Sequence, residues 1–286
     1  MSDPYELLDF GAGRRLEAFG PIRLDRPCPA AEGAACAAPE LWATAQARFD
    51  RTADEAGVWT ARGDLPARWT VPLGGCCFEL KRTEFGHLGL FPEQAENWAW
   101  IAGQVRAAWG PLRVLNLFAY TGGSTLCAAA AGAEVVHVDA ARNVVAWARR
   151  NAELSGLAQA PIRWIGEDAL KFVRRELQRG NHYDAVILDP PSYGHGPRGE
   201  VWQLAQHLPL LLSLCRDLTA GRLRFILLSC HTPGYSPARL QAMMAESLGE
   251  TDSAGIDAQP LLLRTAAGRA LPSGVVVRYG KREGRS

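Results

Sequence analysis

The sequence lacks the features that mark membrane-anchored and secreted proteins. No apolar run approaches the roughly 18 residues that a membrane-spanning helix requires. The amino terminus carries acidic residues such as Glu6 and Asp9, where a secretory leader would place basic residues and then an apolar stretch. These absences predict a cytoplasmic protein.

Cysteine and histidine form no pattern that is typical of a metal site. The chain has 7 cysteines and 6 histidines, without a C-x-x-C pair and without clustering of the two residue types. The odd cysteine count also argues against a disulfide framework. We therefore expect neither a metal nor disulfides.

A basic excess is also missing, since the formal net charge is only +1 at pH 7. Proteins that bind nucleic acids through phosphates usually carry a basic excess or a basic face. Any RNA binding would therefore need positive charge that is gathered locally. Apolar residues, in contrast, are plentiful: 48% of the 286 residues are hydrophobic, enough for the cores of about two domains.

The patterning changes near residue 95 and predicts two domains. Residues 1–95 are turn-rich and contain short strand-like runs such as Trp69–Val71, which indicates a small β-rich or α+β domain. This domain is a candidate platform for substrate or RNA. Residues 96–286 alternate between strands and helices and form the expected second domain.

The second domain is predicted to be an α/β domain with a doubly wound, mostly parallel sheet of seven strands. Helices separate the first five strands, so right-handed crossovers make those strands parallel. No helix-length segment separates the last two, which we expect to pair antiparallel. The expected strands are Val114–Ala119, Val135–Asp139, Ile162–Ile165, Ala185–Leu188, Phe225–Leu228, Leu261–Leu263 and Val275–Val277.

The residues that follow the first two strands indicate a nucleotide cofactor, because ligands of such sheets bind beyond the carboxyl ends of the strands. Gly122 and Gly123 let a ligand approach the turn after the first strand, and the helix that follows offers free N–H groups. Asp139 ends the second strand, where a carboxylate can accept both hydroxyls of a ribose. This spacing fits NAD as well as S-adenosylmethionine, and the alternative role of Asp139 is to cap a helix.

The ends of the third and fourth strands favour S-adenosylmethionine. Asp168 can accept a hydrogen bond from an adenine amino group, or it can cap the helix that begins near Leu170. The fourth strand ends in Asp189-Pro190-Pro191, and the two prolines make a rigid exit that presents Asp189 to the crevice. Nicotinamide enzymes have no common need for this exit.

With these motifs in place, the stretch Asn116–Tyr193 resembles the class I S-adenosylmethionine-dependent methyltransferases, most closely the bacterial ribosomal RNA cytosine-5 methyltransferase group. The motifs are Phe-Ala-Tyr-Thr-Gly-Gly, Val-Asp, Glu-Asp-Ala and Asp-Pro-Pro-Ser, in this order. The chain resembles a short branch of that group that lacks an extra RNA-binding module. The resemblance implies S-adenosylmethionine as cofactor, ribosomal RNA as substrate, and a segment at 89–94 that closes over the cofactor. Candidate cofactor residues are Phe91, Gln94, Asn116, Phe118, Tyr120, Thr121, Gly122, Gly123, Asp139, Asp168 and Asp189.

Cys230 is a candidate nucleophile at the end of the fifth strand. In the RNA cytosine-5 and uracil-5 methyltransferases that the chain resembles, a Ser-Cys pair at this place supplies a thiolate. Carbon 5 of a pyrimidine becomes nucleophilic only after a thiolate adds to carbon 6. The resemblance therefore implies that Cys230 and Asp189 are catalytic. The alternative, a small buried apolar cysteine, stays open.

The loop Ser192–Trp202 follows the same strand end as Asp189, so we expect it to position the target. Arg198 can meet a phosphate, and Tyr193 or Trp202 can stack on a base, although Trp202 can also simply pack on the next helix. Ser192 stands where amino methyltransferases usually have an aromatic ring, which favours carbon 5 of a pyrimidine in structured RNA.

Three other functions compete with RNA base methylation. Methylation of a small molecule or a protein is the first alternative, because the charge is nearly neutral. A non-catalytic binding module is disfavoured by Asp189-Pro190-Pro191. A nicotinamide dehydrogenase is disfavoured because no full G-x-G-x-x-G follows the first strand.

Overall fold

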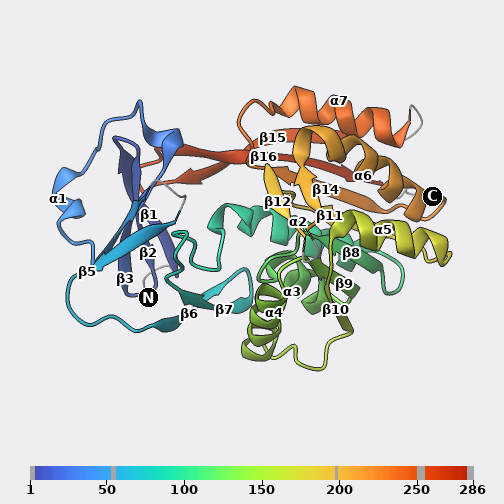
Figure 1. Cartoon of the computed structure of the whole chain (residues 1–286), viewed down its shortest axis with the longest axis horizontal. Helices are drawn as coiled ribbons and strands as arrows, with labels where there is room; N and C mark the ends of the chain where they lie inside the picture. Colours follow the sequence, from blue (N-terminus) through green and yellow to red (C-terminus); the bar gives the residue numbers. More distant parts are fainter. Residues whose placement is uncertain (1–3, 53–55, 197–198, 250–254, 282–286) are drawn as a thin grey trace. The chain divides into compact units, whose positions relative to one another are not determined.

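The computed structural model describes residues 4–52, 56–196, 199–249 and 255–281. The chain divides into two compact units (Figure 1). The first unit comprises Met1–Ala95 and Leu262–Ser273, and the second comprises Glu96–Leu261 and Gly274–Ser286. Each unit is described by itself.

The first unit is built from two sheets, as expected for a β-rich domain. Five strands lie in the order β1-β2-β3-β4-β5, and β6 pairs with β7. All neighbouring pairs are antiparallel except β3 and β4, which are parallel. The elements are β1 (Tyr5–Gly11), β2 (Arg14–Phe19), β3 (Ile22–Pro27), η1 (Pro29–Ala31), α1 (Pro39–Trp42), β4 (Ala47–Arg51), β5 (Gly57–Ala61), β6 (Arg68–Leu73), β7 (Cys76–Lys81) and η2 (Pro92–Gln94).

A late segment of the chain, residues 262–273, belongs to the first unit. Leu263 and Leu271 are buried in one apolar cluster with Leu7, and Nη1 of Arg269 donates a 2.6 Å hydrogen bond to the buried carboxylate of Asp9. The sequence pattern assigns this segment to the second domain. In the structure this segment belongs to the first unit instead, because its apolar side chains are buried there. Such burial depends on tertiary packing and cannot be read from the pattern.

The second unit contains the expected α/β sheet of seven strands, in the order β10-β9-β8-β11-β14-β16-β15. The first five strands are parallel and β16 is antiparallel to β14. β15 and β16 contribute residues to both units. The elements are α2 (Ala95–Ala107), β8 (Arg113–Leu117), α3 (Gly123–Ala130), β9 (Glu134–Asp139), α4 (Arg142–Leu154), β10 (Ile162–Gly166), α5 (Ala169–Gln178), β11 (Ala185–Leu188), β12 (Tyr193–His195), β13 (Val201–Gln203), α6 (Leu204–Leu218), β14 (Phe225–Cys230), α7 (Pro237–Leu248), β15 (Ile256–Arg264) and β16 (Ala270–Gly280).

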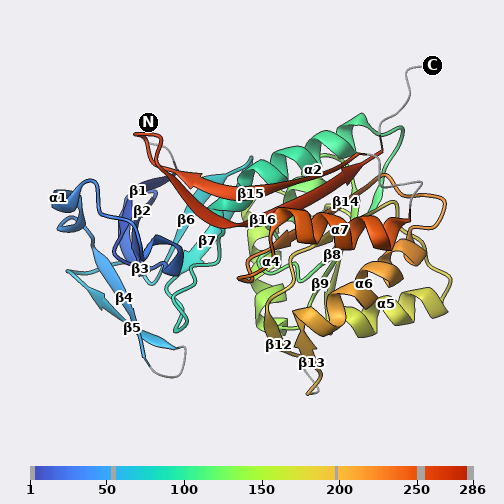
Figure 2. The ribbon, with the colours of Figure 1, turned by 90° about the horizontal axis from the view of Figure 1, so that it is seen from above.

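The central strands form the core because they are apolar on both faces. Every residue of β11 and β14 is buried, as expected for parallel strands that are covered by helices on two sides. α5, α6 and α7 pack on one face of the sheet, and α2 and α3 pack on the other (Figures 1 and 2). In the part of the chain that the structure describes, we find no helix that is long and apolar enough to cross a bilayer.

Candidate active site

The loop between β8 and α3 has an unusual backbone. Phe118, Tyr120 and Gly122 all adopt the left-handed region, with φ of 55°, 48° and 93°. This region is costly for a bulky residue and, where it occurs, it often marks a ligand-binding loop. Nδ2 of Asn151 donates a 2.9 Å hydrogen bond to the carbonyl of Thr121 and fixes the loop from α4. The loop is therefore held in one shape at the end of the first strand.

Asp139 lies at the end of β9 and holds the same loop. Its Oδ2 accepts a 2.9 Å hydrogen bond from the N–H of Tyr120, and its Oδ1 accepts one of 2.9 Å from Ala141. Burial raises the pKa of Asp139, although these two hydrogen bonds oppose the increase. Each oxygen keeps a second lone pair, so the carboxylate can accept two further hydrogen bonds from a diol.

The two glycines of the turn are required by local packing, whether or not a ligand binds. A Cβ on Gly123 would lie 2.4 Å from the indole ring of Trp98. Gly122 has the positive φ noted above, and its Cβ would lie 3.3 Å from that of Ala148. The close approach of Trp98 is a feature that the sequence does not reveal, because it joins α2 to α3.

Asn116 is buried in β8 and bonds to neighbouring side chains, and its cofactor role stays a prediction. Its Nδ2 donates a 2.9 Å hydrogen bond to Oγ1 of Thr125, which lies 2.9 Å from Nδ1 of His137. All three side chains are buried, and burial lowers the pKa of His137 to about 3. A neutral polar network thus supports the strand ends. Thr125 and His137 give no motif in the sequence that would identify them.

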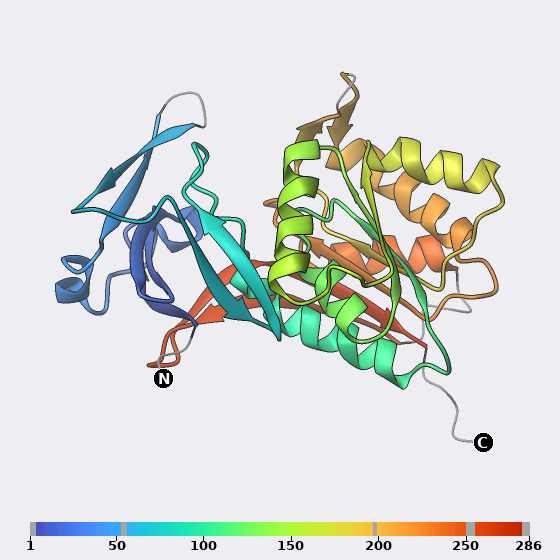
Figure 3. The same ribbon diagram turned by 90° about the horizontal axis from the view of Figure 1, so that it is seen from below.

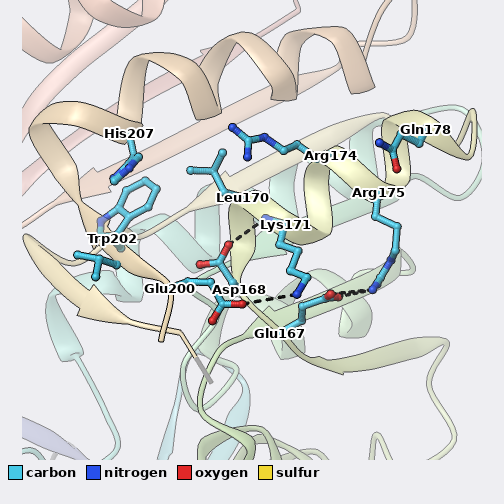
Figure 4. A pocket seen from close by; sticks show the side chains of 11 residues that line it. Glu167, Asp168, Leu170, Lys171, Arg174, Arg175, Gln178, Glu200, Trp202 and His207 are labelled. Atoms are coloured by element: carbon cyan, nitrogen blue, oxygen red, sulfur yellow. Dashed lines mark hydrogen bonds and ion pairs between the residues drawn. The ribbon is translucent and has the colours of Figure 1, made fainter. Parts of the chain in front are cut away.

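Asp168 caps α5, and it also lines a pocket. Its Oδ1 accepts a 2.9 Å hydrogen bond from the N–H of Lys171, as the capping alternative predicts. The pocket has a volume of about 580 Å³ and lies between α5 and the strand β13 (Figure 4). Two ion pairs line the pocket. Arg175 pairs with Glu167 at 2.6 Å, and Lys171 pairs with Glu200 at 3.6 Å. The lining residues are Glu167, Asp168, Leu170, Lys171, Arg174, Arg175, Gln178, Glu200, Val201, Trp202 and His207.

Asp189, at the end of β11, is held by two residues of the neighbouring strand end. Oγ of Ser229 donates a 2.7 Å hydrogen bond to Oδ1 of Asp189, and Nε2 of His231 lies 3.4 Å from the same oxygen. Burial by itself would raise the pKa of Asp189, but the positive charge of His231 and the hydrogen bonds from both residues lower it. Asp189 is therefore an ionised acceptor in a fixed position.

The sequence does not pair Asp189 with Ser229 and His231, because the pairing depends on sheet order. β11 and β14 are neighbours in the sheet, with Leu188 opposite Leu228. The residues that follow these two leucines therefore meet at one edge.

Cys230 follows Ser229, the residue that contacts Asp189, and its own side chain belongs to an apolar cluster. Its side chain is buried, with 1% of the residue exposed, in an apolar cluster that also contains Leu240 and Met244 of α7. Burial raises the pKa of Cys230 by more than hydrogen bonds with Thr232 lower it. The thiol is thus protonated and shielded in this conformation. Its role as a nucleophile stays a prediction.

The loop after Asp189 forms a hairpin of β12 and β13. Trp202 is buried, donates a 2.7 Å hydrogen bond from Nε1 to the carbonyl of Pro191, and packs its ring 4.8 Å from that of Phe118. Trp202 therefore takes the packing role among its two alternatives. Tyr193 is 53% exposed. Arg198 lies outside the described residues.

Phe91 and Gln94 belong to the first unit. Gln94 is buried in η2, and the ring of Phe91 contacts His87 edge-on, with centroids 5.6 Å apart. Because the two units are described separately, the cofactor role of Phe91 and Gln94 stays a prediction.

The parallel sheet, the strained turn and the acids at successive strand ends define the class of α/β enzymes that bind a nucleotide cofactor. A family model described as S-adenosylmethionine-dependent methyltransferase matches residues 30–242. The chain belongs to this family, is an S-adenosylmethionine-dependent methyltransferase, and uses S-adenosylmethionine as its cofactor. No group of histidine, cysteine and acidic side chains that could hold a metal occurs among the described residues.

The solved and curated proteins that this chain resembles are also named as methyltransferases. The crystal structure of the S-adenosylmethionine-dependent methyltransferase from Agrobacterium tumefaciens is 39% identical, with 98% of this chain and 91% of that chain covered and a TM-score of 0.92. Ribosomal RNA large subunit methyltransferase I of Aeromonas hydrophila is 43% identical over 82 residues, and methyltransferase K/L of Syntrophotalea carbinolica is 33% identical over 127 residues. These matches cover 28% and 44% of this chain, but only 21% and 17% of the two curated relatives.

Proposed function

We propose that this methyltransferase modifies a base in ribosomal RNA, and that Asp189 holds the target. The observation that carries the proposal is the fixed, ionised carboxylate of Asp189 between Ser229 and His231, at the strand ends of a methyltransferase sheet. The substrate class rests on the curated relatives, which are named as ribosomal RNA methyltransferases.

The described residues fit the cofactor. We assign the ribose hydroxyls to Asp139, whose two oxygens are oriented by backbone N–H groups. We assign the methionine end to the turn Tyr120–Gly123 and the first turn of α3, which no side chain caps among the described residues. The adenine lies near Asp168 in this proposal, and Phe91 and Gln94 of the first unit stay candidate cofactor residues. The bound cofactor supplies a methyl group on a sulfonium, which is an electrophile.

The protein contributes position and charge. The Asp189 carboxylate accepts a hydrogen bond from an amino or imino group of the target base, and it orients the acceptor atom toward the cofactor. Ser229 and His231 keep the carboxylate in place, so little reorganisation is needed when the base arrives. Holding two reactants in a productive geometry accounts for a large share of the rate in such transfers.

The sequence favours carbon 5 of a pyrimidine as the methyl acceptor. Methyl transfer to this atom requires a thiolate, which Cys230 would supply. The burial of Cys230 and the increase in its pKa weigh against a resting thiolate. These observations favour an acceptor that Asp189 can hold without a covalent adduct. Carbon-5 transfer would require that Cys230 becomes exposed when RNA binds.

The proposal is tested by comparing the modified nucleosides of ribosomal RNA from cells with and without the gene, by mass spectrometry. We expect one methylated base to disappear with the gene and to return when the purified enzyme and S-adenosylmethionine are added. The nature of that base distinguishes carbon 5 from other acceptors. An unchanged set of nucleosides would instead support the alternative, methylation of a small molecule or a protein.

A further inference from the structure

The hairpin of β12 and β13 exposes an aromatic pair close to Asp189. Tyr193 follows Asp189 by only four positions, yet it is 53% exposed. The rings of Tyr193 and His195 meet edge-on, with centroids 5.0 Å apart and planes at 83°. The Tyr193 hydroxyl also lies 3.3 Å from Nε2 of His195. His195 orients the tyrosine ring through this edge-on contact but does not stack on it, so a face of the Tyr193 ring stays open.

The strand pairing puts the exposed side chains on one face of the hairpin. Tyr193 and His195 alternate with Gly194, which lies opposite the buried Trp202. Val201 lies opposite His195 and is 45% exposed. We call Tyr193, His195 and Val201 the outer face of the hairpin. Figures 2 and 3 show β12 and β13 projecting from the body of the second unit.

The outer face is held firmly although it is exposed. The Trp202 indole anchors the hairpin to Pro191, Oγ of Ser192 lies 2.7 Å from Oγ1 of Thr232, and the N–H of Leu204 donates a 3.0 Å hydrogen bond to the carbonyl of Ser192. These contacts tie both strands of the hairpin to the ends of the central strands. A ligand that stacks on the ring therefore meets a surface that is already ordered, which lowers the entropic cost of binding.

The charge of the chain favours RNA as the occupant of this face. Lysine and arginine outnumber aspartate and glutamate in residues 96–286, whereas the acids outnumber the bases in residues 1–95. The larger part of the sequence, which carries the hairpin, therefore has the excess of positive charge that binding of a polyanion favours. Exposed aromatic rings bind unpaired bases by stacking, and they do so with little preference for sequence.

We propose that the outer face of the hairpin is a stacking site for an unpaired nucleobase of the RNA, adjacent to the target that Asp189 holds. The inference rests on the proposed function, because it needs an RNA substrate. Tyr193 supplies the ring on which the base stacks, and His195 fixes the orientation of that ring. The nucleotide whose base stacks here is a neighbour of the target nucleotide and not the target itself.

The test compares Tyr193→Ala and Tyr193→Phe with the wild-type enzyme. Binding of a fluorescein-labelled, unstructured RNA is measured by anisotropy, and KM is measured for both RNA and S-adenosylmethionine. Tyr193→Ala should weaken RNA binding and raise the KM for RNA by about 10-fold, the loss expected for one stacked base. Tyr193→Phe should restore most of the binding, because it keeps the ring. The KM for S-adenosylmethionine and the thermal midpoint should not change.

Trp109→Ala is the matched control, because Trp109 is an aromatic residue of the same unit that is 89% exposed. This variant should bind RNA like the wild type. If the wild type methylates RNA and Tyr193→Ala does so with unchanged KM and affinity, the stacking site is wrong and the proposed function stands. If the wild type neither binds nor methylates RNA, both are wrong. Equal losses in Tyr193→Ala and Trp109→Ala would also overturn the site, because any exposed ring would then suffice.

Discussion

Ser229 donates a 2.7 Å hydrogen bond to Oδ1 of Asp189 across two adjacent parallel strands. His231 approaches the same oxygen, at 3.4 Å. A single carboxylate is thus held from one neighbouring strand by two side chains of different chemistry. The arrangement keeps Asp189 ionised and fixed.

The activity should persist at acid pH until Asp189 is protonated. His231 and Ser229 lower the pKa of Asp189, so the active carboxylate is retained below the usual carboxyl range, and activity is lost as the pH falls through this lowered value. His231→Gln removes the positive charge and should move the acid limb of the kcat/KM profile to higher pH. Ser229→Ala should move it in the same direction by a smaller amount. Superimposable acid limbs for wild type and His231→Gln would show that Asp189 is not held in this way.

The contacts of Asp189 with His231 and Ser229 should also stabilise the folded state, but only in one pH range. Since the pKa of Asp189 is lower in the folded state than in the unfolded state, the contribution is present above the unfolded value near pH 3.9 and is lost as the pH falls through the folded value. Urea unfolding at neutral and acid pH should show a smaller difference between wild type and Asp189→Asn at the acid end. A difference that grows on acidification would contradict the sign of this shift.

Cofactor binding should depend on Asp139. Asp139→Ala removes the acceptor of the ribose hydroxyls and the partner of the Tyr120 and Ala141 N–H groups, so it should weaken S-adenosylmethionine binding by about 1–3 kcal/mol. Isothermal calorimetry measures the loss directly. Asp184→Ala is a control. Asp184 also accepts a hydrogen bond from a strand backbone, at 2.8 Å from the N–H of Arg113, but it directly precedes β11 and so lies at the opposite end of that strand from the cofactor. If the two variants lose equal affinity, Asp139 has no specific role.

The turn glycine Gly123 should be intolerant of any side chain. Gly123→Ala places a Cβ 2.4 Å from Trp98, so it should destabilise the fold by about 1–3 kcal/mol through overpacking. Gly103→Ala in α2 is the matched control. Its Cβ would meet nothing within 4 Å, and it should be neutral or stabilising by about 0.5–1 kcal/mol. Equal urea midpoints for the two variants would show that Trp98 does not exclude a side chain at Gly123.

Cys230→Ala should fold, bind S-adenosylmethionine and keep most of its turnover. The reason is that the Cys230 thiol is buried among apolar side chains and its pKa is raised. Single-turnover methylation measures the rate of the step itself. Complete loss of turnover in a folded variant that binds cofactor, together with covalent trapping of the wild type by a 5-fluoropyrimidine RNA, would establish Cys230 as the nucleophile instead.

Much of the fold can be predicted from the sequence because the central strands are buried on both faces. Such strands appear as short apolar runs between helices, and Ala185–Leu188 is found within the bounds that its pattern predicts. The first strand is shorter than expected: β8 ends at Leu117, because Phe118 turns into the left-handed region. Backbone strain of this kind leaves no pattern in residue types.

The site is less predictable than the fold, because contacts between elements decide it. Asp139 and Asp189 are identified by their positions after strands, but the partners of Asp189 require the order of strands in the sheet. The face of Cys230 follows from the alternation of side chains along β14, which turns Cys230 away from the neighbour Ser229. The motif alone does not say which of the two residues meets Asp189.

We propose that this methyltransferase modifies a base in ribosomal RNA and that Asp189 holds that base. The most direct measurement incubates the purified enzyme with isotope-labelled S-adenosylmethionine and ribosomal RNA from cells that lack the gene, and then analyses the nucleosides by mass spectrometry. We expect label in one methylated base with the wild type, and at least a 100-fold lower rate, about 2.7 kcal/mol, with a folded Asp189→Asn that still binds cofactor. Label that is absent from RNA, or that enters RNA equally fast with both enzymes, would contradict it.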